Sequence, residues 1–118
     1  MSQNPSAVRI RIRSSSGELF AMGPGKAELL AAILETGSIA AAGRKLGMSY
    51  QKTRQLVDEM NLCFASPLVE GFKGGAQGGG TQLTAVGREA LERYRAMQAR
   101  AETAIVEDLA AFQTLLAH

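Results

Sequence analysis

The chain has 118 residues, enough for one domain with its own core but not for two independent domains. With 46% apolar and 20% charged residues it is globular rather than disordered, and its net charge of +2 is compatible with nucleic acid without arguing strongly for it. Cys63 is the only cysteine and His118 the only histidine. An internal disulfide is therefore excluded. A single histidine at the last position also argues against a histidine-based metal site or catalytic triad.

The N-terminal residues lack the apolar core segment of a signal peptide, and no apolar run approaches the length of a membrane span. An unpaired cysteine also fits a reducing compartment. The sequence therefore predicts a cytoplasmic protein that is not in contact with a membrane. We interpret Cys63 as a small apolar filler, and a redox sensor is the alternative.

From residue 7 onward, two kinds of side chain alternate. The β-branched ones are Val8, Ile10 and Ile12, and the basic ones between them are Arg9, Arg11 and Arg13. This period of two predicts a half-buried strand, and a turn over residues 14–17 lets the chain return, which gives a β-hairpin over residues 7–22. The arginines either contact phosphate or protect the sheet edge from pairing with another chain, and we favour the edge role.

A three-helix cluster is predicted over residues 24–62. Pro24 suits the first turn of the first helix. Ser38 and Ser49 suit the N-caps of the next two helices, and Gly47 between them suits a helix end with positive φ. Two short helices joined by so tight a connection are the outline of a helix-turn-helix.

The second helix of this motif has an apolar and a polar side when it is drawn as a wheel. The core side consists of Thr53, Leu56, Val57 and Met60, and Tyr50 at its margin is also a candidate DNA contact. The outer side consists of Gln51 and Gln55, flanked by Lys52 and Arg54. Long amides and cations in this place can reach base edges and phosphates in a DNA major groove. The alternative is that they are only the solvated residues of a surface helix.

Residues 67–84 have the pattern of two short strands around a glycine-rich loop, which runs from Lys73 to Gly80. Such a hairpin directly after a helix-turn-helix makes a winged helix. The loop is not a P-loop, because no Gly-Lys-Ser/Thr follows the glycines and no helix begins directly after them. We interpret it as a wing whose Lys73 and Gln77 settle against a DNA backbone or minor groove. A hairpin without a partner is the alternative.

Thr84 is predicted to cap a final helix over residues 85–116, with one apolar stripe along it. The distal members of the stripe are Tyr94, Met97, Ala101, Ile105, Leu109, Phe112 and Leu116. At ~1.5 Å per residue this helix is on the order of 45 Å long, which is more than a small winged-helix core can cover. We expect these residues to form a homodimer interface, which would place two recognition helices against successive major grooves. A helix that folds back on its own domain is the alternative.

These elements together predict a single domain over residues 1–118 that is mainly α with small β elements (α+β). Its architecture is a winged helix-turn-helix with an N-terminal β-hairpin and a long C-terminal dimerisation helix.

The chain contains, in this order, the segments GSIAAAGRKLGMSY, VDEMN and PLVE, then the glycine-rich loop, an LT pair and Gly87. Over roughly Gly23 to Tyr94, these segments resemble the DNA-binding domain of ModE-type molybdate-responsive regulators. LysR-type regulators, a more distant likeness, share the winged helix and the long helix but have a less glycine-rich wing. The resemblance implies recognition-helix positions for Ser49, Gln51, Lys52, Arg54 and Gln55.

This chain departs from the ModE pattern in two respects. Thr53-Arg54 stands where ModE-like sequences usually carry Ala-Trp, so we expect a different preferred DNA sequence. The chain also stops before the oxyanion-binding domains of a full-length ModE could begin. We therefore expect a stand-alone form without a cofactor, to which molybdate sensing does not simply carry over.

The leading hypothesis is a homodimeric, sequence-specific DNA-binding transcriptional regulator, with a possible link to genes of molybdenum uptake or use. Backbone contacts from Arg44, Lys45, Lys73 and the wing amides would position the dimer on DNA. The bases would be read by Gln51, Arg54 and Gln55.

The alternative hypothesis is a winged-helix protein-interaction module that does not read DNA. The cationic, amide-rich outer face of the second helix argues against it, whereas Asp58 and Glu59 on the same helix argue for it. We do not expect an enzyme, because no histidine, usable cysteine or pair of carboxylates can be placed in one site. The operator sequence, the direction of regulation and the effector are left open.

Overall fold

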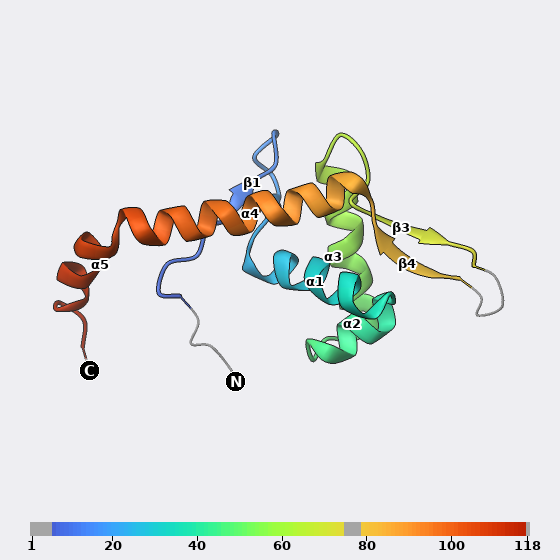
Figure 1. Ribbon diagram of the computed structural model, residues 1–118, viewed down its shortest axis with the longest axis horizontal. Helices are drawn as coiled ribbons and strands as arrows, with labels where there is room; N and C mark the ends of the chain where they lie inside the picture. Colours follow the sequence, from blue (N-terminus) through green and yellow to red (C-terminus); the bar gives the residue numbers. More distant parts are fainter. Residues whose placement is uncertain (1–5, 75–78, 118) are drawn as a thin grey trace.

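A computed structural model describes residues 6–74 and 79–117 of the chain. The elements in chain order are β1 (Ile12–Arg13), β2 (Phe20–Met22), α1 (Pro24–Thr36), α2 (Ile39–Lys45), α3 (Tyr50–Cys63), β3 (Val69–Phe72), β4 (Gly80–Leu83), α4 (Ala85–Ala104) and α5 (Val106–Gln113). Figure 1 shows α1, α2 and α3 clustered against α4, with the β3–β4 hairpin projecting at one end and α5 at the other. This arrangement is the predicted α+β winged helix-turn-helix.

Both helices of the helix-turn-helix begin directly after the predicted N-cap serines, and α3 ends at Cys63, one residue beyond the predicted cluster. The hydroxyl oxygen of Ser38 accepts a hydrogen bond from the Ala41 amide at 3.0 Å, and that of Ser49 accepts one from the Lys52 amide at 3.1 Å. Each bond satisfies an amide that has no carbonyl partner within its helix. Gly47 between the two helices has a φ of 73°, which is the left-handed conformation that favours glycine.

The core lies between α1, α3, α4 and the two strand pairs. Its fully buried side chains are Leu29, Leu30, Ile33, Thr53, Met60 and Leu68. On α3 the predicted core side is confirmed, since Thr53, Val57 and Met60 are buried. α2 packs tightly on this helix, because a Cβ atom at Gly43 would lie 2.3 Å from the hydroxyl oxygen of Thr53.

The N-terminal hairpin is shorter than the predicted range of residues 7–22, because β1 has only two residues. The backbone before β1 is paired with α4 instead of with a strand. Gln98 Nε2 donates to the Val8 carbonyl at 2.5 Å, and Gln98 Oε1 accepts from the Ile10 amide at 2.9 Å. The Tyr94 hydroxyl donates to the Ile10 carbonyl at 2.7 Å. Side chains of α4 thus take the place of a partner strand.

The single helix predicted over residues 85–116 is two helices, α4 and α5, which meet at Ile105 (φ −112°, ψ 14°). Thr103, Ile105 and Val106 are β-branched and disfavour a helix there, whereas Glu107 favours the start of a new one. α5 contains no buried residue. The radius of gyration is 16.4 Å, against about 13.5 Å for a compact domain of this length, so the C-terminal part extends away from the core.

Candidate nucleic-acid interface

The outer face of α3 brings together most of the predicted base-reading residues. Tyr50, Gln51, Arg54 and Gln55 line a hollow of about 420 Å³, which continues along Asp58, Glu59 and Leu62. Lys52 is exposed nearby, whereas the Ser49 hydroxyl is used as the cap of the helix. The start of α3 lies on the side of the domain away from α4 (Figure 1), so this face is open to a large partner.

Two of these polar side chains are paired with carboxylates one turn further along α3. Arg54 Nε lies 3.3 Å from Asp58 Oδ1, and Gln55 Nε2 donates to Glu59 Oε2 at 3.1 Å. Exposed ion pairs at this spacing are typically worth only about 0.3–0.5 kcal/mol. A phosphate or a base edge can therefore replace Asp58 as the partner of Arg54.

Glu59 has a second partner on the inner side of α3. Lys26 of α1 is buried, and its Nζ lies 3.0 Å from Glu59 Oε1. The hydrogen bond from Lys26 is the main cause that lowers the pKa of the Glu59 carboxyl, and it outweighs the opposing effect of desolvation. Lys26 could not be predicted as a site residue from the sequence, because a lysine in the first turn of a helix is usually solvated.

The wing is fixed to two helices at its base. The Thr81 amide donates to the Gly37 carbonyl at the end of α1, at 2.9 Å. The side-chain amide of Asn61 on α3 donates to the Val69 carbonyl at 3.1 Å and accepts from the Leu68 amide at 2.9 Å. These bonds hold the β3–β4 hairpin in one orientation relative to α3. Asn61, which lies in the VDEMN segment, thus positions the wing, a role that the segment alone does not indicate.

The predicted wing contacts lie beyond this anchored base. β3 and β4 pair antiparallel from Val69 opposite Leu83 to Phe72 opposite Gly80. Lys73 directly follows β3 and is exposed. Gln77 lies outside the described residues, so its predicted contact stays a prediction.

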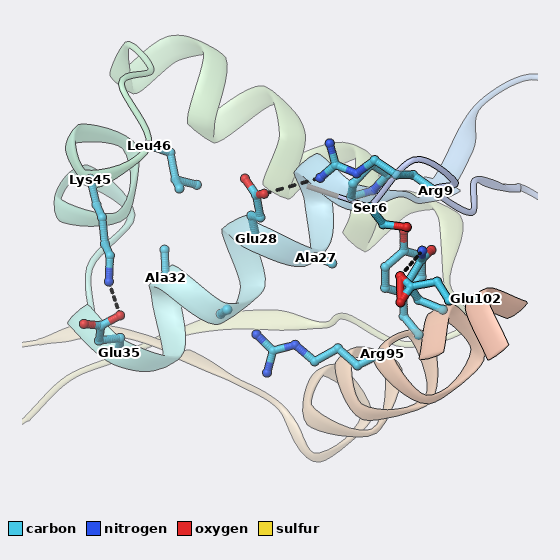
Figure 2. Close-up of a pocket in the computed structure, with 14 residues that line it drawn as sticks. Ser6, Arg9, Ala27, Glu28, Ala32, Glu35, Lys45, Leu46, Arg95 and Glu102 are labelled. Atoms are coloured by element: carbon cyan, nitrogen blue, oxygen red, sulfur yellow. Dashed lines mark hydrogen bonds and ion pairs between the residues drawn. The ribbon is translucent and has the colours of Figure 1, made fainter. Parts of the chain in front are cut away.

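Arg44 and Lys45 at the end of α2, both predicted to contact the DNA backbone, have different surroundings. Arg44 is exposed, whereas Lys45 forms an ion pair with Glu35 of α1. Figure 2 shows this pair at the rim of a groove of about 550 Å³ between α1, α4 and the N-terminal segment. In the same groove, Arg9 pairs with Glu28 at 3.5 Å. Lys45 is thus turned toward α1, and Arg44 is the α2 cation that stays free of this groove.

The other two N-terminal arginines contact the aromatic ring of β2. The guanidinium carbons of Arg11 and Arg13 lie 5.6 and 4.7 Å from the ring centre of Phe20. These distances are those of cation–π contacts. Arg11 and Arg13 thus pack on the ring of the paired strand, and their proposed role at the sheet edge stays a prediction.

The predicted dimer residues fall into two groups. Tyr94 is 5% exposed and belongs to the core, because its ring fills the space under the N-terminal segment, so its assignment to a dimer interface is corrected. Burial is also the main cause that raises the pKa of its hydroxyl. Met97, Phe112 and Leu116 are exposed by 42%, 60% and 55%. Half-buried positions among the others are Ala101, Ile105 and Leu109.

Among residues 6–74 and 79–117, no three histidine, cysteine or carboxylate side chains gather so as to hold a metal ion. In the same part of the chain, each helix is too short or too polar to cross a bilayer.

The chain is similar to the crystal structure of a CbnR_DBD–DNA complex, with a TM-score of 0.56 and 24% identity, covering 74% of this chain and 94% of that one. It is also similar to CbnR, a LysR family transcriptional regulator, with a TM-score of 0.55 over 74% of this chain and 28% of that one. The domain therefore has the winged helix-turn-helix fold seen in LysR-type regulators.

No protein-family model matches the chain. It is 44% identical over 78 residues to the molybdenum-pterin-binding protein MopB of Rhodobacter capsulatus, covering 66% of this chain and 29% of MopB. It is 42% identical over 77 residues to the molybdenum transport protein ModE of Azotobacter vinelandii, covering 65% of this chain and 28% of that protein. It is 33% identical over 97 residues to the transcriptional regulator ModE of Yersinia pestis, covering 80% of this chain and 37% of that protein.

The resemblance to ModE-type regulators is thus confirmed. The chain spans only 28–37% of the length of these three relatives. Similarity over this part does not show that the chain binds or regulates what those whole proteins bind and regulate.

Proposed function

We propose that the chain is a DNA-binding transcriptional regulator that acts as a homodimer and reads a specific sequence with α3. The observation that carries this proposal is the two-sided character of α3. Thr53, Val57 and Met60 fix its inner side in the core, and the amides and cations of its outer side are exposed. A surface of this kind can enter a major groove while the anchored wing meets the flanking backbone.

The homodimer is supported by the exposed apolar side chains of α4, of α5 and of the residues directly after α5. Exposed members of this surface are Met97, Val106, Phe112, Leu115 and Leu116. A monomer would leave all of them in water, whereas a two-fold partner would cover them and double the DNA contacts.

A selection from random DNA duplexes at near-physiological salt tests this function. We expect enrichment of a palindromic motif with half-sites about one helical turn apart. If no sequence is enriched, and binding disappears as salt rises, only nonspecific charge attraction is left. The protein-interaction module would then be the better description.

Replacing Arg54 with Ala is expected to relax the base preference at one position of each half-site. A good bidentate contact between arginine and guanine contributes about 1–3 kcal/mol of discrimination, and alanine cannot make it. The measurement is a repeated selection with the variant. An unchanged motif would remove Arg54 from the base-reading set.

Replacing Lys73 with Ala is expected to weaken binding to every duplex by a similar factor. A phosphate contact carries no base information, and its loss lowers the slope of log K against log salt by about 1. Titrations at several salt concentrations with the selected site and a scrambled site measure both effects. A change of preferred sequence would contradict the assignment of Lys73 to the backbone.

We also propose that the regulated genes serve molybdenum uptake or use. The support is the identity of 33–44% to proteins named for molybdenum-pterin binding, molybdenum transport and ModE regulation. The test is to delete the gene and measure transcripts of molybdate transport genes with and without molybdate. Unchanged transcripts, with the selected motif absent from their promoters, would refute this link and leave DNA binding intact.

A further inference from the structure

A buried lysine of α1 is connected to the outer face of α3 by consecutive polar contacts. Lys26 is 8% exposed, and its Nζ donates to the Phe20 carbonyl at 2.5 Å and lies 3.0 Å from Glu59 Oε1. The other carboxylate oxygen, Glu59 Oε2, accepts a hydrogen bond from Gln55 Nε2 at 3.1 Å. Gln55 is exposed, so the contacts lead from the interior to the surface that faces DNA in the proposed function.

Glu59 lies between the interior and the outer face of α3. It lines a cavity of about 500 Å³ together with Lys26 and Phe20, and also the hollow on the outer face with Gln55. The hydrogen bond from Lys26 lowers the pKa of the Glu59 carboxyl and so favours its ionised form, which accepts hydrogen bonds but cannot donate them. The amide nitrogen of Gln55, rather than its oxygen, must therefore face Glu59.

We propose that Lys26 is a positioning residue for base recognition, which acts through Glu59 to fix the orientation of the Gln55 amide. This inference rests on the proposed function. One N–H of Gln55 is given to Glu59, so its oxygen and its second N–H are left for a base edge. That pair matches N6 and N7 of adenine in the major groove, and adenine is the base that Gln55 reads. The charge of Lys26 also cancels that of Glu59, so the carboxylate does not repel DNA phosphate.

Replacing Lys26 with Met keeps an unbranched side chain in the core and removes the charge. Gln55 then samples about three staggered rotamers instead of one, so the preference for adenine falls about threefold or more. Binding to all duplexes weakens as well, because the charge of Glu59 is no longer balanced. Lys26→Arg keeps the charge and the N–H donors, and it is expected to retain the preference.

Two double variants separate positioning from a structural role. In Gln55→Ala the adenine preference is already lost, so adding Lys26→Met weakens all binding without a further change of preference. In Lys26→Met/Glu59→Leu both charges are gone, so overall affinity recovers while the preference stays lost. The matched control is Arg93→Met, which removes an exposed cation of α4 that pairs with Glu89, and it leaves the preference unchanged.

The measurement is competition between duplexes that differ only at the base position where Gln55→Ala loses its preference, with thermal unfolding of each variant. Wild-type protein without any sequence preference overturns the proposed function itself. A wild-type preference that Lys26→Met fully retains overturns the inference alone. If Lys26→Met does not fold, nitrogen-15 relaxation of the Gln55 side-chain amide decides: a restrained amide in wild type and Lys26→Arg supports positioning, and a freely rotating one overturns it.

Discussion

Replacing Gly87 with Ala lowers the free energy of unfolding by about 3 kcal/mol or more and the melting temperature by about 10 °C or more. Gly87 lies in the first turn of α4, where the helix crosses the start of the wing. A Cβ atom there would lie 2.1 Å from the carbonyl oxygen of Leu68 and 3.0 Å from its carbonyl carbon. Because both are backbone atoms, no change of side-chain rotamer can relieve the overlap.

The carbonyl of Leu68 also has little freedom to move. It accepts a hydrogen bond from the Thr84 amide at 2.9 Å, and the Leu68 side chain is fully buried. The Gly87 amide in turn donates to the Thr84 hydroxyl at 2.9 Å, which caps α4. Moving the helix away from β3 would break this cap and uncover part of the core, so the added methyl group costs more than in an ordinary helix turn.

Gly25→Ala is the matched control for this prediction. It makes the same chemical change in the first turn of another helix, α1, where an added Cβ atom would meet no heavy atom within 4 Å. Higher helix propensity is expected to make this variant more stable by up to about 1 kcal/mol. Thermal or urea unfolding of both variants provides the test. If the two variants melt at the same temperature, the close approach of α4 to β3 is refuted.

The parts of the fold that could be predicted from the sequence are those that depend on residues close together in the chain. The caps at Ser38 and Ser49, the turn glycine Gly47 and the wing all depend on neighbouring residues, and each is confirmed. Gln98 shows the limit of such signals. It lies 88 residues beyond Ile10, whose amide it binds, and nothing in a local pattern indicates that contact.

In the candidate site, too, local features could be predicted and long-range contacts could not. The outward position of Arg54 and Gln55 follows from the period of the helix, so the sequence could predict it. Their pairing with Asp58 and Glu59 also follows from a spacing of four. The burial of Lys26 against Glu59 depends on how α1 crosses α3, and the bend at Ile105 depends on a local balance between weak propensities. Neither could be derived from a hydrophobic pattern.

The bend changes how the dimer must form but not the reason to expect one. α5 has no fully buried residue and Leu109 is only half-buried, so most of the apolar surface of α5 stays in water within one protomer. Phe112 of α5 and Leu116 just after it are exposed by 60% and 55%, and covering the exposed part of each is worth about 1–2 kcal/mol. We expect Phe112→Asp/Leu116→Asp to abolish the homodimer at micromolar concentration, because it removes this gain in both copies and buries charge in its place.

The expected consequence is a loss of about 10²- to 10⁴-fold in affinity for a palindromic site, since each protomer must then bind its half-site alone. Affinity for a single half-site and the melting profile of the winged-helix core should barely change. The control is Ala99→Asp/Thr114→Asp, which adds the same charge at exposed positions away from the apolar stripe. Sedimentation gives the oligomeric state of each protein. A wild type that sediments as a monomer, or a Phe112→Asp/Leu116→Asp variant that remains a dimer, would contradict the proposed interface, because these two side chains affect assembly only if a partner covers them.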